Sequence, residues 1–545
     1  MKNRDSALSA RFDEQEIDSI FADVNQGLLP GVAVGIAIDG LPVYRKGFGL
    51  ASIELPVTLS PSTRMRIGSI SKHFTAFAYM MFCESGIADI DDPVGKYLPQ
   101  LHPIAHKVTI RQLMGNTSGL REATDIVVQF SGVEGRPVSA DQVLSLYRDM
   151  DDVNAAAGTA YNYNNGGFLI LSAIIEKISG LSLERALWEH VFKPAGMYDT
   201  LLRRSDQAYL SNSASTHVAS GTGTYLRMEP IGGIDFAGAG AVVSTIDNLL
   251  RWMANMDRPI VGNSNTWEVM RAPQKLKNGT STGYGLGLET VYRRGVMRVE
   301  HGGGGFGGNS MMVKVPQARL DVIVITNRSD RSAFLYTEKI LDACLPNLEP
   351  IPARYEGPFT SGLFRSPTTG RVVQLLRGTW PNLPGEGLQL AAIDGHYFPF
   401  APDEYGVLRT VTPADSHNCA ISVTGEWAAP SSIQLNEFGN VDWMERVVPT
   451  GIGDTDDIIG RFRSETTGTD LTITNSIDGN HFMRAEGRFG SACHQIECLS
   501  RGIWRTWALD KMVAPPWGLL LFTDDCRELG FYNATNSNIR FRRVL

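Results

Sequence analysis

Hydrophobic and polar positions in the first 345 residues follow both strand-like and helix-like patterns. Residues 32–38 form an apolar run, and a second strand-like segment follows the Asp-Gly pair at 39–40, which predicts a β-hairpin. Residues 74–82 are apolar on every side, which predicts a buried helix, and another apolar helix is expected to follow Asn165. Further strands are expected at 284–289, 297–301, 310–315 and 321–326. Strands at both ends of this region, with helices between them, predict an α/β sandwich around an antiparallel sheet.

Beyond residue 345 the pattern changes to short alternating strands. Residues 345–352 are rich in proline and are typical of a linker. The segment G-L-F-R-S-P-T-T-G starts at Gly362 and returns as G-R-F-R-S-E-T-T-G at Gly460, 98 residues further on. Two such copies predict two similar small antiparallel β-barrel domains. The expected domains of this multidomain chain are residues 1–345, 346–455 and 456–545.

The composition is that of a globular protein. The 545 residues are 43% hydrophobic and 20% charged, and the formal net charge of −8 argues against nucleic acid or an anionic membrane as a partner. The N-terminus has no apolar signal core, and no apolar run of about 18 residues occurs, so a cytoplasmic protein is the simplest expectation. The six cysteines form no C-x-x-C pair, so neither zinc nor a disulfide framework is expected.

The most specific chemical motif is S-x-x-K, formed by Ser69 and Lys72. This spacing places both side chains on one face of the expected buried helix. Burial lowers the pKa of a lysine, so Lys72 could act as a neutral base that activates the Ser69 hydroxyl as a nucleophile. Gly68 allows a tight entry that places the Ser69 N–H at the positive end of the helix. Because serine also caps helices, the motif alone leaves a purely structural explanation open.

Two further segments favour a catalytic site. Tyr163 and Asn165 end a loop before an apolar helix; tyrosine can transfer a proton, and asparagine can bind a substrate carbonyl and a lysine together. His301 begins a glycine-rich strand in which Gly303 and Gly304 would let a substrate approach closely. A backbone N–H there could complete an oxyanion hole with the N–H of the serine. Each segment alone also fits an ordinary core tyrosine, strand histidine or glycine loop.

The order of these motifs resembles the serine penicillin-recognising enzymes, which include class C β-lactamases, DD-peptidases and related esterases and aminopeptidases. The family pattern is S-x-x-K, then Y-x-N, then K-T-G or H-x-G on a strand, and this chain has it at Ser69, Tyr163 and His301. A helper segment is similar to the family's L-x-x-H-T-S-G-L, with Asn116 in place of the histidine. The match covers roughly residues 15–345.

The two expected barrels narrow the resemblance to the bacterial D-aminopeptidase family, in which a penicillin-recognising domain precedes two antiparallel β-barrels. Residues 457–462 open the last domain as in that family, and Trp504 followed by M-V-A-P at 512–515 is similar to the family's W…M-D-A-P stretch. In the family this stretch belongs to a loop that reaches into the active site and limits substrate length. The resemblance implies that residues 509–517 form such a capping loop here.

The resemblance implies a serine hydrolase that releases N-terminal D-amino acids from peptides, amides or esters through an acyl-enzyme. Ser69 would attack the carbonyl, Lys72 and Tyr163 would share the acid–base work, and Asn165 would orient the acyl group. The preference for the D-configuration comes from the resemblance only. No metal or cofactor is expected. The expected partner is a small peptide, amide or ester substrate, and a homodimer is compatible with the chain.

The chain also departs from this family. Val513 stands where the family has the loop aspartate that meets the substrate's ammonium group. Glu289, or Asp510 in the same loop, could supply the missing charge; alternatively, Glu289 is a solvent-facing strand residue. Histidine in place of K-T-G is mostly neutral near pH 7, which disfavours carboxylate recognition and favours an amine or ester. An esterase or β-lactamase-like hydrolase on the same site, and a catalytically silent peptide-binding protein, remain alternatives.

Overall fold

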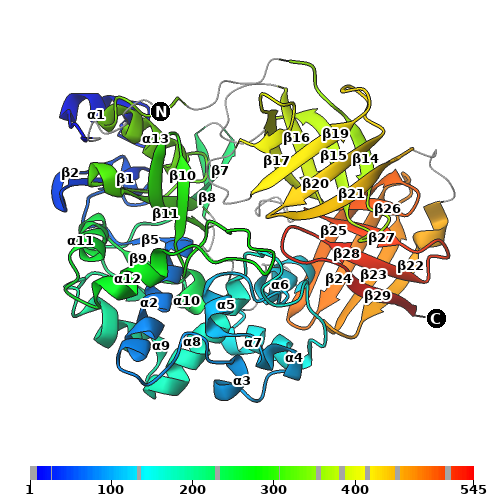
Figure 1. Ribbon diagram of the computed structural model, residues 1–545, viewed down its shortest axis with the longest axis horizontal. Helices are drawn as coiled ribbons and strands as arrows, with labels where there is room; N and C mark the ends of the chain where they lie inside the picture. The colour runs from blue at the N-terminus through cyan, green and yellow to red at the C-terminus, as the bar shows by residue number, and fades with distance from the viewer. Residues whose placement is uncertain are drawn as a thin grey trace.

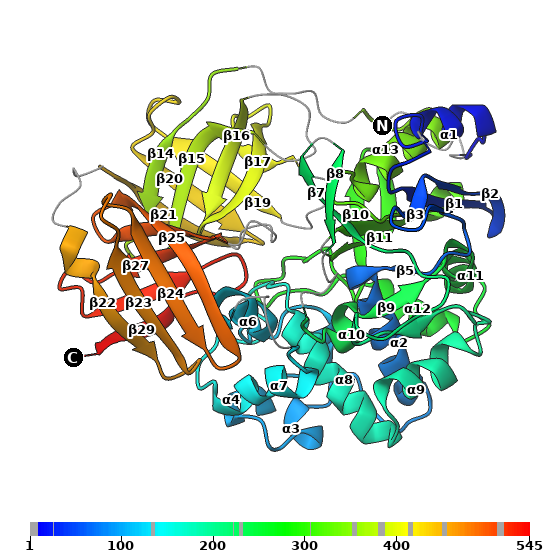
Figure 2. The same ribbon diagram turned by 180° about the vertical axis from the view of Figure 1, so that it is seen from behind.

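A mixed helix–sheet region and two β-barrels make up the molecule, with the barrels next to each other on one side of it (Figure 1; Figure 2 shows the reverse). The computed structural model describes residues 9–25, 27–131, 137–221, 223–227, 233–305, 307–350, 357–379, 387–411, 418–448, 455–509 and 517–544. The expected α/β region followed by two antiparallel barrels is confirmed.

The central sheet has six antiparallel strands in the order β10-β11-β12-β13-β1-β2. Their bounds are Glu289–Arg293 (β10), Val296–Gly305 (β11), Gly308–Val315 (β12), Leu320–Thr326 (β13), Val32–Ile38 (β1) and Leu41–Phe48 (β2). The predicted hairpin of β1 and β2 pairs with β13, with Val32 opposite Thr326, so the two ends of the region meet in one sheet. The β1 strand is buried on both faces because α11 (Ile246–Asp257) covers one, while α1 (Glu14–Ile20) and α13 (Ala333–Cys344) lie on the other.

The second layer of this region is a group of helices below the sheet in Figure 1. The α-helices are α2 (Ser71–Glu84), α3 (Val94–Tyr97), α4 (Pro103–His106), α5 (Ile110–Met114), α6 (Ala123–Ser131), α7 (Ala140–Asp149), α8 (Asn165–Ser179), α9 (Leu183–Leu187), α10 (Ala237–Gly240) and α12 (Ser264–Arg271). Single turns are η1 (Gly68–Ile70), η2 (Trp188–Phe192), η3 (Pro316–Ala318) and η4 (Thr455–Ile458). Helix α2 is enclosed by α8, α10 and α12, which confirms the predicted buried helix.

Short strands connect these elements. They are β3 (Leu50–Ser52), β4 (Val57–Thr58), β5 (Met65–Arg66), β6 (Leu201–Leu202), β7 (His217–Gly221), β8 (Thr224–Arg227) and β9 (Val242–Ser244). The strand expected at 284–289 is wrong, because only Glu289 belongs to β10. Gly287 has a positive φ of 74°, and a Cβ there would lie 2.9 Å from the His73 backbone. The chain therefore turns tightly against α2 instead of extending.

The remaining strands close into two eight-stranded barrels. The first contains β14 (Gly362–Arg365), β15 (Val372–Gly378), β16 (Leu388–Ile393), β17 (His396–Pro402), β18 (Leu408–Thr410), β19 (Cys419–Thr424), β20 (Ser432–Glu437) and β21 (Asn440–Val447). The second contains β22 (Gly460–Ser464), β23 (Thr469–Asn475), β24 (His481–Gly487), β25 (Gly490–Ser500), β26 (Ile503–Ala508), β27 (Trp517–Phe522), β28 (Glu528–Tyr532) and β29 (Ile539–Val544). The repeated glycine opens the first strand of each barrel, so the internal echo marks equivalent positions.

Both barrels contact the helical layer. In the second barrel, the rings of Phe531 and Phe541 pack edge-on against Phe130 of α6, with centroids 5.0 and 5.6 Å away. The apolar interior of this barrel thereby continues the core of the helix–sheet region. In the first barrel, the turn between β20 and β21 places the Phe438 ring 4.9 Å from that of Tyr161. The barrels are therefore packed onto the region that carries the sequence motifs.

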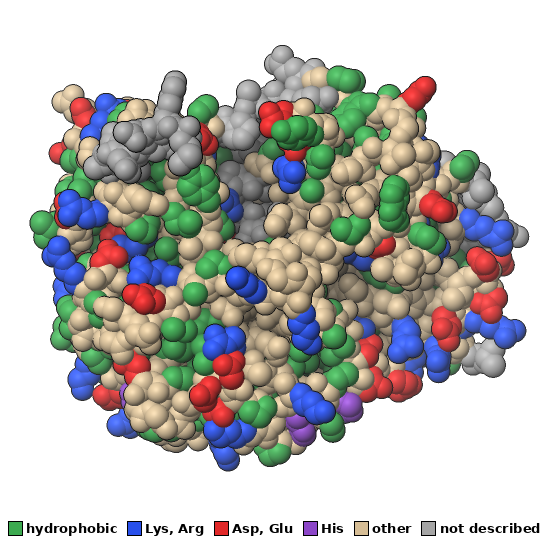
Figure 3. Space-filling view, in the orientation of Figure 1, with side chains coloured by type: hydrophobic (Ala, Val, Ile, Leu, Met, Phe, Trp, Pro, Cys, Tyr) green, Lys and Arg blue, Asp and Glu red, His purple; other side chains and the backbone are tan. Residues whose placement is uncertain are grey.

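The surface is mixed in charge. On the face in Figure 3, basic and acidic side chains are interspersed with scattered hydrophobic ones. Among the described residues, the six cysteines are all unpaired thiols, and no group of three or more His, Cys, Asp or Glu side chains is arranged to hold a metal ion. In the same ranges no single helix is long and apolar enough to cross a membrane; only the bent pair of α8 with Leu183–Phe192 meets that length and composition together.

The contact of Phe130 with Phe531 and Phe541 predicts how much the interface with the last barrel stabilises the protein. Phe130→Ala removes a fully buried ring from between two others, so the free energy of unfolding should fall by about 3–5 kcal/mol. Denaturant unfolding of the full chain measures this, with Tyr209→Ala, a fully exposed aromatic position, as the control expected to leave it unchanged. A loss no larger than that of the control would show that this interface contributes little.

Candidate active site

Ser69 lies where the chain crosses the glycine-rich strand β11. It occupies η1, one turn before α2, and not the first α-helical turn as expected. Gly68 has a φ of 52°, and a Cβ there would lie 2.7 Å from the Gly304 nitrogen. A Cβ on Gly303 would lie 2.0 Å from the Ile67 carbonyl oxygen. Glycine is thus required on both sides of this crossing, which brings the Ser69 backbone beside Gly303 and Gly304.

The Lys72 amine is completely buried and lies between three elements. Its Nζ is 2.9 Å from Ser69 Oγ, 2.7 Å from Asn165 Oδ1 at the start of α8, and 2.8 Å from the Ala239 carbonyl of α10. Burial lowers the pKa of Lys72 to about 7, although the negative charge of Glu122 opposes this. The amine is therefore poised to be neutral at moderately alkaline pH.

Tyr163 lies next to both the serine and the lysine. Its hydroxyl is hydrogen-bonded to Ser69, and its ring centroid is 4.6 Å from the Lys72 amine. Burial raises the pKa of Tyr163, and the charges of Glu289 and Glu122 raise it further against the opposing effect of the Ser69 hydrogen bond. Tyr163 is therefore a neutral phenol that can donate a proton.

The loop that carries Tyr163 is fixed by two asparagines. Asn116 adopts a positive φ of 56°, its carbonyl accepts from the Asn162 N–H (2.8 Å), and its side-chain oxygen accepts from the Asn164 N–H (3.0 Å). The Asn164 side chain in turn caps α8 by accepting from the Gly167 N–H at 2.8 Å. Asparagine tolerates this left-handed backbone, so Asn116 suits its position although the resembling family has histidine there.

His301 is buried within β11 and uncharged. Its Nδ1 lies 2.6 Å from the Gly302 carbonyl and must donate to it, so Nε2 accepts from the Tyr284 hydroxyl at 2.9 Å. Burial lowers the pKa of His301 to about 3, and the nearby charge of Lys72 acts in the same direction. This histidine supplies no permanent positive charge for a substrate carboxylate.

Glu289 is buried, with only 8% of its surface exposed, so the solvent-facing interpretation is wrong. It begins β10 opposite Glu300 of β11. Its charge raises the pKa of both Tyr163 and Tyr284, which places it within electrostatic reach of the site. Asp510 and Val513, with the expected capping loop, lie outside the described residues.

Sequence reasoning missed Glu122. Its buried carboxylate accepts from the Gly166 N–H (2.8 Å) at the start of α8, and from Thr124 and the Asp125 N–H in the first turn of α6. Burial and the charge of Asp125 raise the pKa of Glu122 to about 7. Nothing in the local sequence distinguishes this glutamate from a surface residue, because its hydrogen-bond partner in α8 is 44 positions away.

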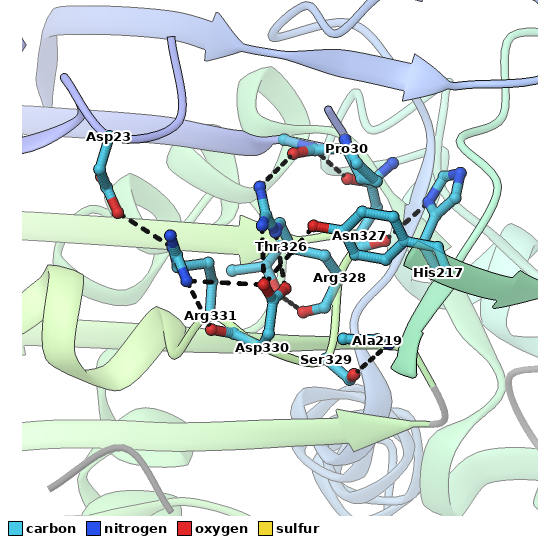
Figure 4. Close-up of polar contacts among 12 residues, drawn as sticks. Asp23, Pro30, His217, Ala219, Thr326, Asn327, Arg328, Ser329, Asp330 and Arg331 are labelled. Carbon is cyan, nitrogen blue, oxygen red and sulfur yellow. Dashed lines mark hydrogen bonds and ion pairs between the residues drawn. The ribbon is translucent and has the colours of Figure 1, made fainter. Parts of the chain in front are cut away.

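A small cavity of about 40 Å³ lies beside the crossing and is lined by Gly68, Gly303, Gly304 and Asn327, among others. Its far wall is the end of β13, which polar contacts fix in place. Figure 4 shows the ring of His217 directed at the Asn327 carbonyl (3.0 Å), with Arg328 paired to Asp330 beside it. The cavity is lined by Gly68, the residue before the serine.

The comparisons with known proteins agree with this architecture. The family model described as Beta-lactamase matches residues 17–345, more than half of the chain, and the chain belongs to that family. It is 28% identical over 348 residues to a D-aminopeptidase of Brucella canis, a match that covers 64% of this chain and 65% of the relative. It is 26% identical over 498 residues to a D-aminopeptidase of Cereibacter sphaeroides, covering 90% of each. The expected resemblance to D-aminopeptidases is confirmed.

Among solved structures, the octameric penicillin-binding protein homologue from Pyrococcus abyssi matches with a TM-score of 0.55 and 19% identity. The match covers 97% of this chain and 100% of that one, and at this identity it shows the fold alone. The chain spans about two thirds of the length of the Brucella relative that it matches.

The protonation of Lys72 predicts how the rate of hydrolysis depends on pH. A lysine can take a proton from the serine only when it is neutral. If Lys72 is the base, kcat/KM should rise with pH through a midpoint of about 7 and then level off. Tyr163 stays protonated over this range because its pKa is raised. The measurement uses an ester without ionisable groups, with initial rates from about pH 5 to 9. A profile that is flat or falls over this range would contradict a neutral lysine base.

Proposed function

We propose that the protein is a serine hydrolase that releases N-terminal D-amino acids from peptides, amides or esters through an acyl-enzyme. The observation that carries the proposal is the buried Lys72 amine, 2.9 Å from Ser69 Oγ, with a neutral Tyr163 hydrogen-bonded to the same serine. The relatives named D-aminopeptidase support this substrate class and the stereochemical preference.

The contacts of Lys72 suit a neutral amine. A neutral amine has two hydrogens and one lone pair, and two of its three neighbours, Asn165 Oδ1 and the Ala239 carbonyl, can only accept. The lone pair is then directed at the Ser69 hydroxyl, which donates to it. Lys72 removes this proton as Ser69 Oγ attacks the carbonyl carbon of the first residue of the substrate.

The developing oxyanion would be held by the Ser69 N–H and a backbone N–H of Gly303 or Gly304, where the two segments cross. Tyr163 donates its proton to the leaving amine or alcohol and is reprotonated from Lys72. Water then enters, loses a proton to the same pair, and attacks the acyl carbonyl carbon. The bond between the acyl group and Ser69 Oγ breaks, the proton returns from the pair to Ser69 Oγ, and the amino acid is released. Asn165 orients the acyl group and at the same time fixes the lysine.

Specificity for a free amine would come from Glu289. A buried carboxylate near Tyr163 matches an ammonium group on the acyl side of the substrate, and a neutral His301 offers nothing to a carboxylate. Asp510 is the alternative acid if Glu289 fails this role.

The first test is the nucleophile. Ser69→Ala should abolish hydrolysis of D-alanine amide while leaving the fold intact, because one hydroxyl is a small change in packing. Ser85→Ala, at the exposed end of α2, is the matched control and should retain full activity. L-Alanine amide, an acetate ester and a cephalosporin are compared in parallel. Wild-type enzyme that does not turn over D-alanine amide, or Ser69→Ala that does, would refute the proposal.

The second test is the amine. Glu289→Gln keeps the shape and removes the charge, so kcat/KM for D-alanine amide should fall by about ten- to a hundredfold, the value of a charge-assisted hydrogen bond. N-acylated and ester substrates should be nearly unaffected. Glu268→Gln, on the exposed side of α12, is the charge-matched control. Equal losses on both substrate types would mean that Glu289 supports β10 and not the amine.

A further inference from the structure

The turn between β28 and β29 of the last barrel contacts the loop before α6 through a dense set of hydrogen bonds. Asn536 forms a two-way pair with the Glu122 backbone: its Oδ1 accepts from the Glu122 N–H (3.0 Å) and its Nδ2 donates to the Glu122 carbonyl (3.2 Å). Arg121 donates to the Ser537 carbonyl at 2.8 Å and forms an ion pair with Asp152. The turn of the barrel thus binds the backbone of this loop as a neighbouring β-strand would, although the two segments are more than 400 residues apart in the sequence.

The same turn also fixes the first helical turn of α6. The partly buried carboxylate of Asp125 accepts from Asn533 Nδ2 (2.5 Å), Thr535 Oγ1 (2.9 Å) and Asn536 Nδ2 (3.3 Å). A carboxylate without such donors would be costly to bury. The barrel therefore holds both the backbone of Glu122 and the residue three positions after it.

The Glu122 side chain connects the contact with the barrel to the reacting groups through the start of α8. Its carboxylate accepts from the Gly166 N–H at 2.8 Å, and the preceding residue, Asn165, accepts from the Lys72 amine at 2.7 Å. A Cβ on Gly166 would lie 2.0 Å from the Tyr147 hydroxyl, so the backbone at this point has no freedom to shift toward α7. Displacement of Glu122 would displace the start of α8 and with it the partner of the lysine.

Resting on the function proposed above, we propose that Glu122 is a positioning residue for the reaction and that the last barrel, through Asn536, holds it in place. The barrel then supports the catalytic geometry in addition to covering α6. Glu122 reaches the reacting atoms only through Asn165 and through its charge.

The charge of Glu122 should affect the pH dependence of the reaction, which the loss of a merely structural residue would not change. The ionisable groups around it are Lys72 of α2, Asp125 of α6, Tyr147 of α7 and Tyr163 before α8. A negative charge on Glu122 raises the pKa of Lys72, because it stabilises the ammonium form. Removing that charge must lower the pKa of Lys72, and the pH at which the serine becomes reactive should fall with it.

The experiment compares the full-length wild type with Glu122→Gln, Asn536→Ala and Asn480→Ala. Asn480 lies exposed in the turn between β23 and β24 of the same barrel and is the matched control. Two rates are measured against pH for each: hydrolysis of an uncharged ester, and labelling of Ser69 by a fluorophosphonate probe followed by mass spectrometry. The labelling rate reports the reactivity of the serine whatever the natural substrate is. Thermal unfolding is recorded alongside.

Glu122→Gln should shift the midpoint of both profiles to lower pH by about one unit. Asn536→Ala should lower the plateau rates by about ten- to a hundredfold, as expected for a small misplacement of catalytic groups. Asn480→Ala should match the wild type.

Unchanged midpoint and plateau rates in the folded variants would overturn the inference, even if their melting temperatures fall. If Glu122→Gln does not fold, the plateau rates of Asn536→Ala decide whether the inference holds. Wild-type protein that is labelled but releases no D-amino acid would refute the proposed substrate class while leaving this test intact. Wild-type protein inert to both reagents would refute the proposed function and this inference together.

Discussion

The burial of one lysine amine is the constraint on which the active site depends. Burying an ammonium group costs free energy unless the group loses its proton or forms hydrogen bonds, and both are possible for Lys72. The partners come from three places: η1 supplies Ser69, α8 supplies Asn165 and α10 supplies Ala239. The apolar surface of α2 buries the helix among these elements, so the packing that stabilises the domain also sets the chemistry of the lysine.

The barrels extend this arrangement from outside the family domain. The first barrel places Phe438 against Tyr161, two residues before Tyr163, and the second places Asn536 against Glu122. The first contact is on the loop that leads to α8. The second is on the loop before α6, where the Glu122 side chain accepts from the Gly166 N–H of α8, so the start of α8 is held from two sides. The apolar core of the second barrel is continuous with that of the family domain.

Local patterns explain what the sequence predicted well. The β1–β2 hairpin follows from an apolar run and an Asp-Gly turn, and the all-apolar pattern after Lys72 is typical of a buried helix such as α2. The strand expected at 284–289 failed because Gly287 turns the chain against His73, a contact that no periodicity records. The exposure of Glu289 was left open for a similar reason: strand alternation does not show which face of an edge strand is covered.

By itself, the sequence determined the order and spacing of S-x-x-K, Y-x-N and the histidine–glycine strand, the two-barrel repeat, and hence the kind of chemistry. These features are short-range, since a serine and a lysine three positions apart share a helix face wherever the helix lies. Only the tertiary structure decided which groups surround Lys72, which hydrogen bonds His301 makes, and that Glu122 joins the site to the last barrel. Those properties depend on desolvation and on contacts between residues hundreds of positions apart. A short stretch of the sequence shows neither of these.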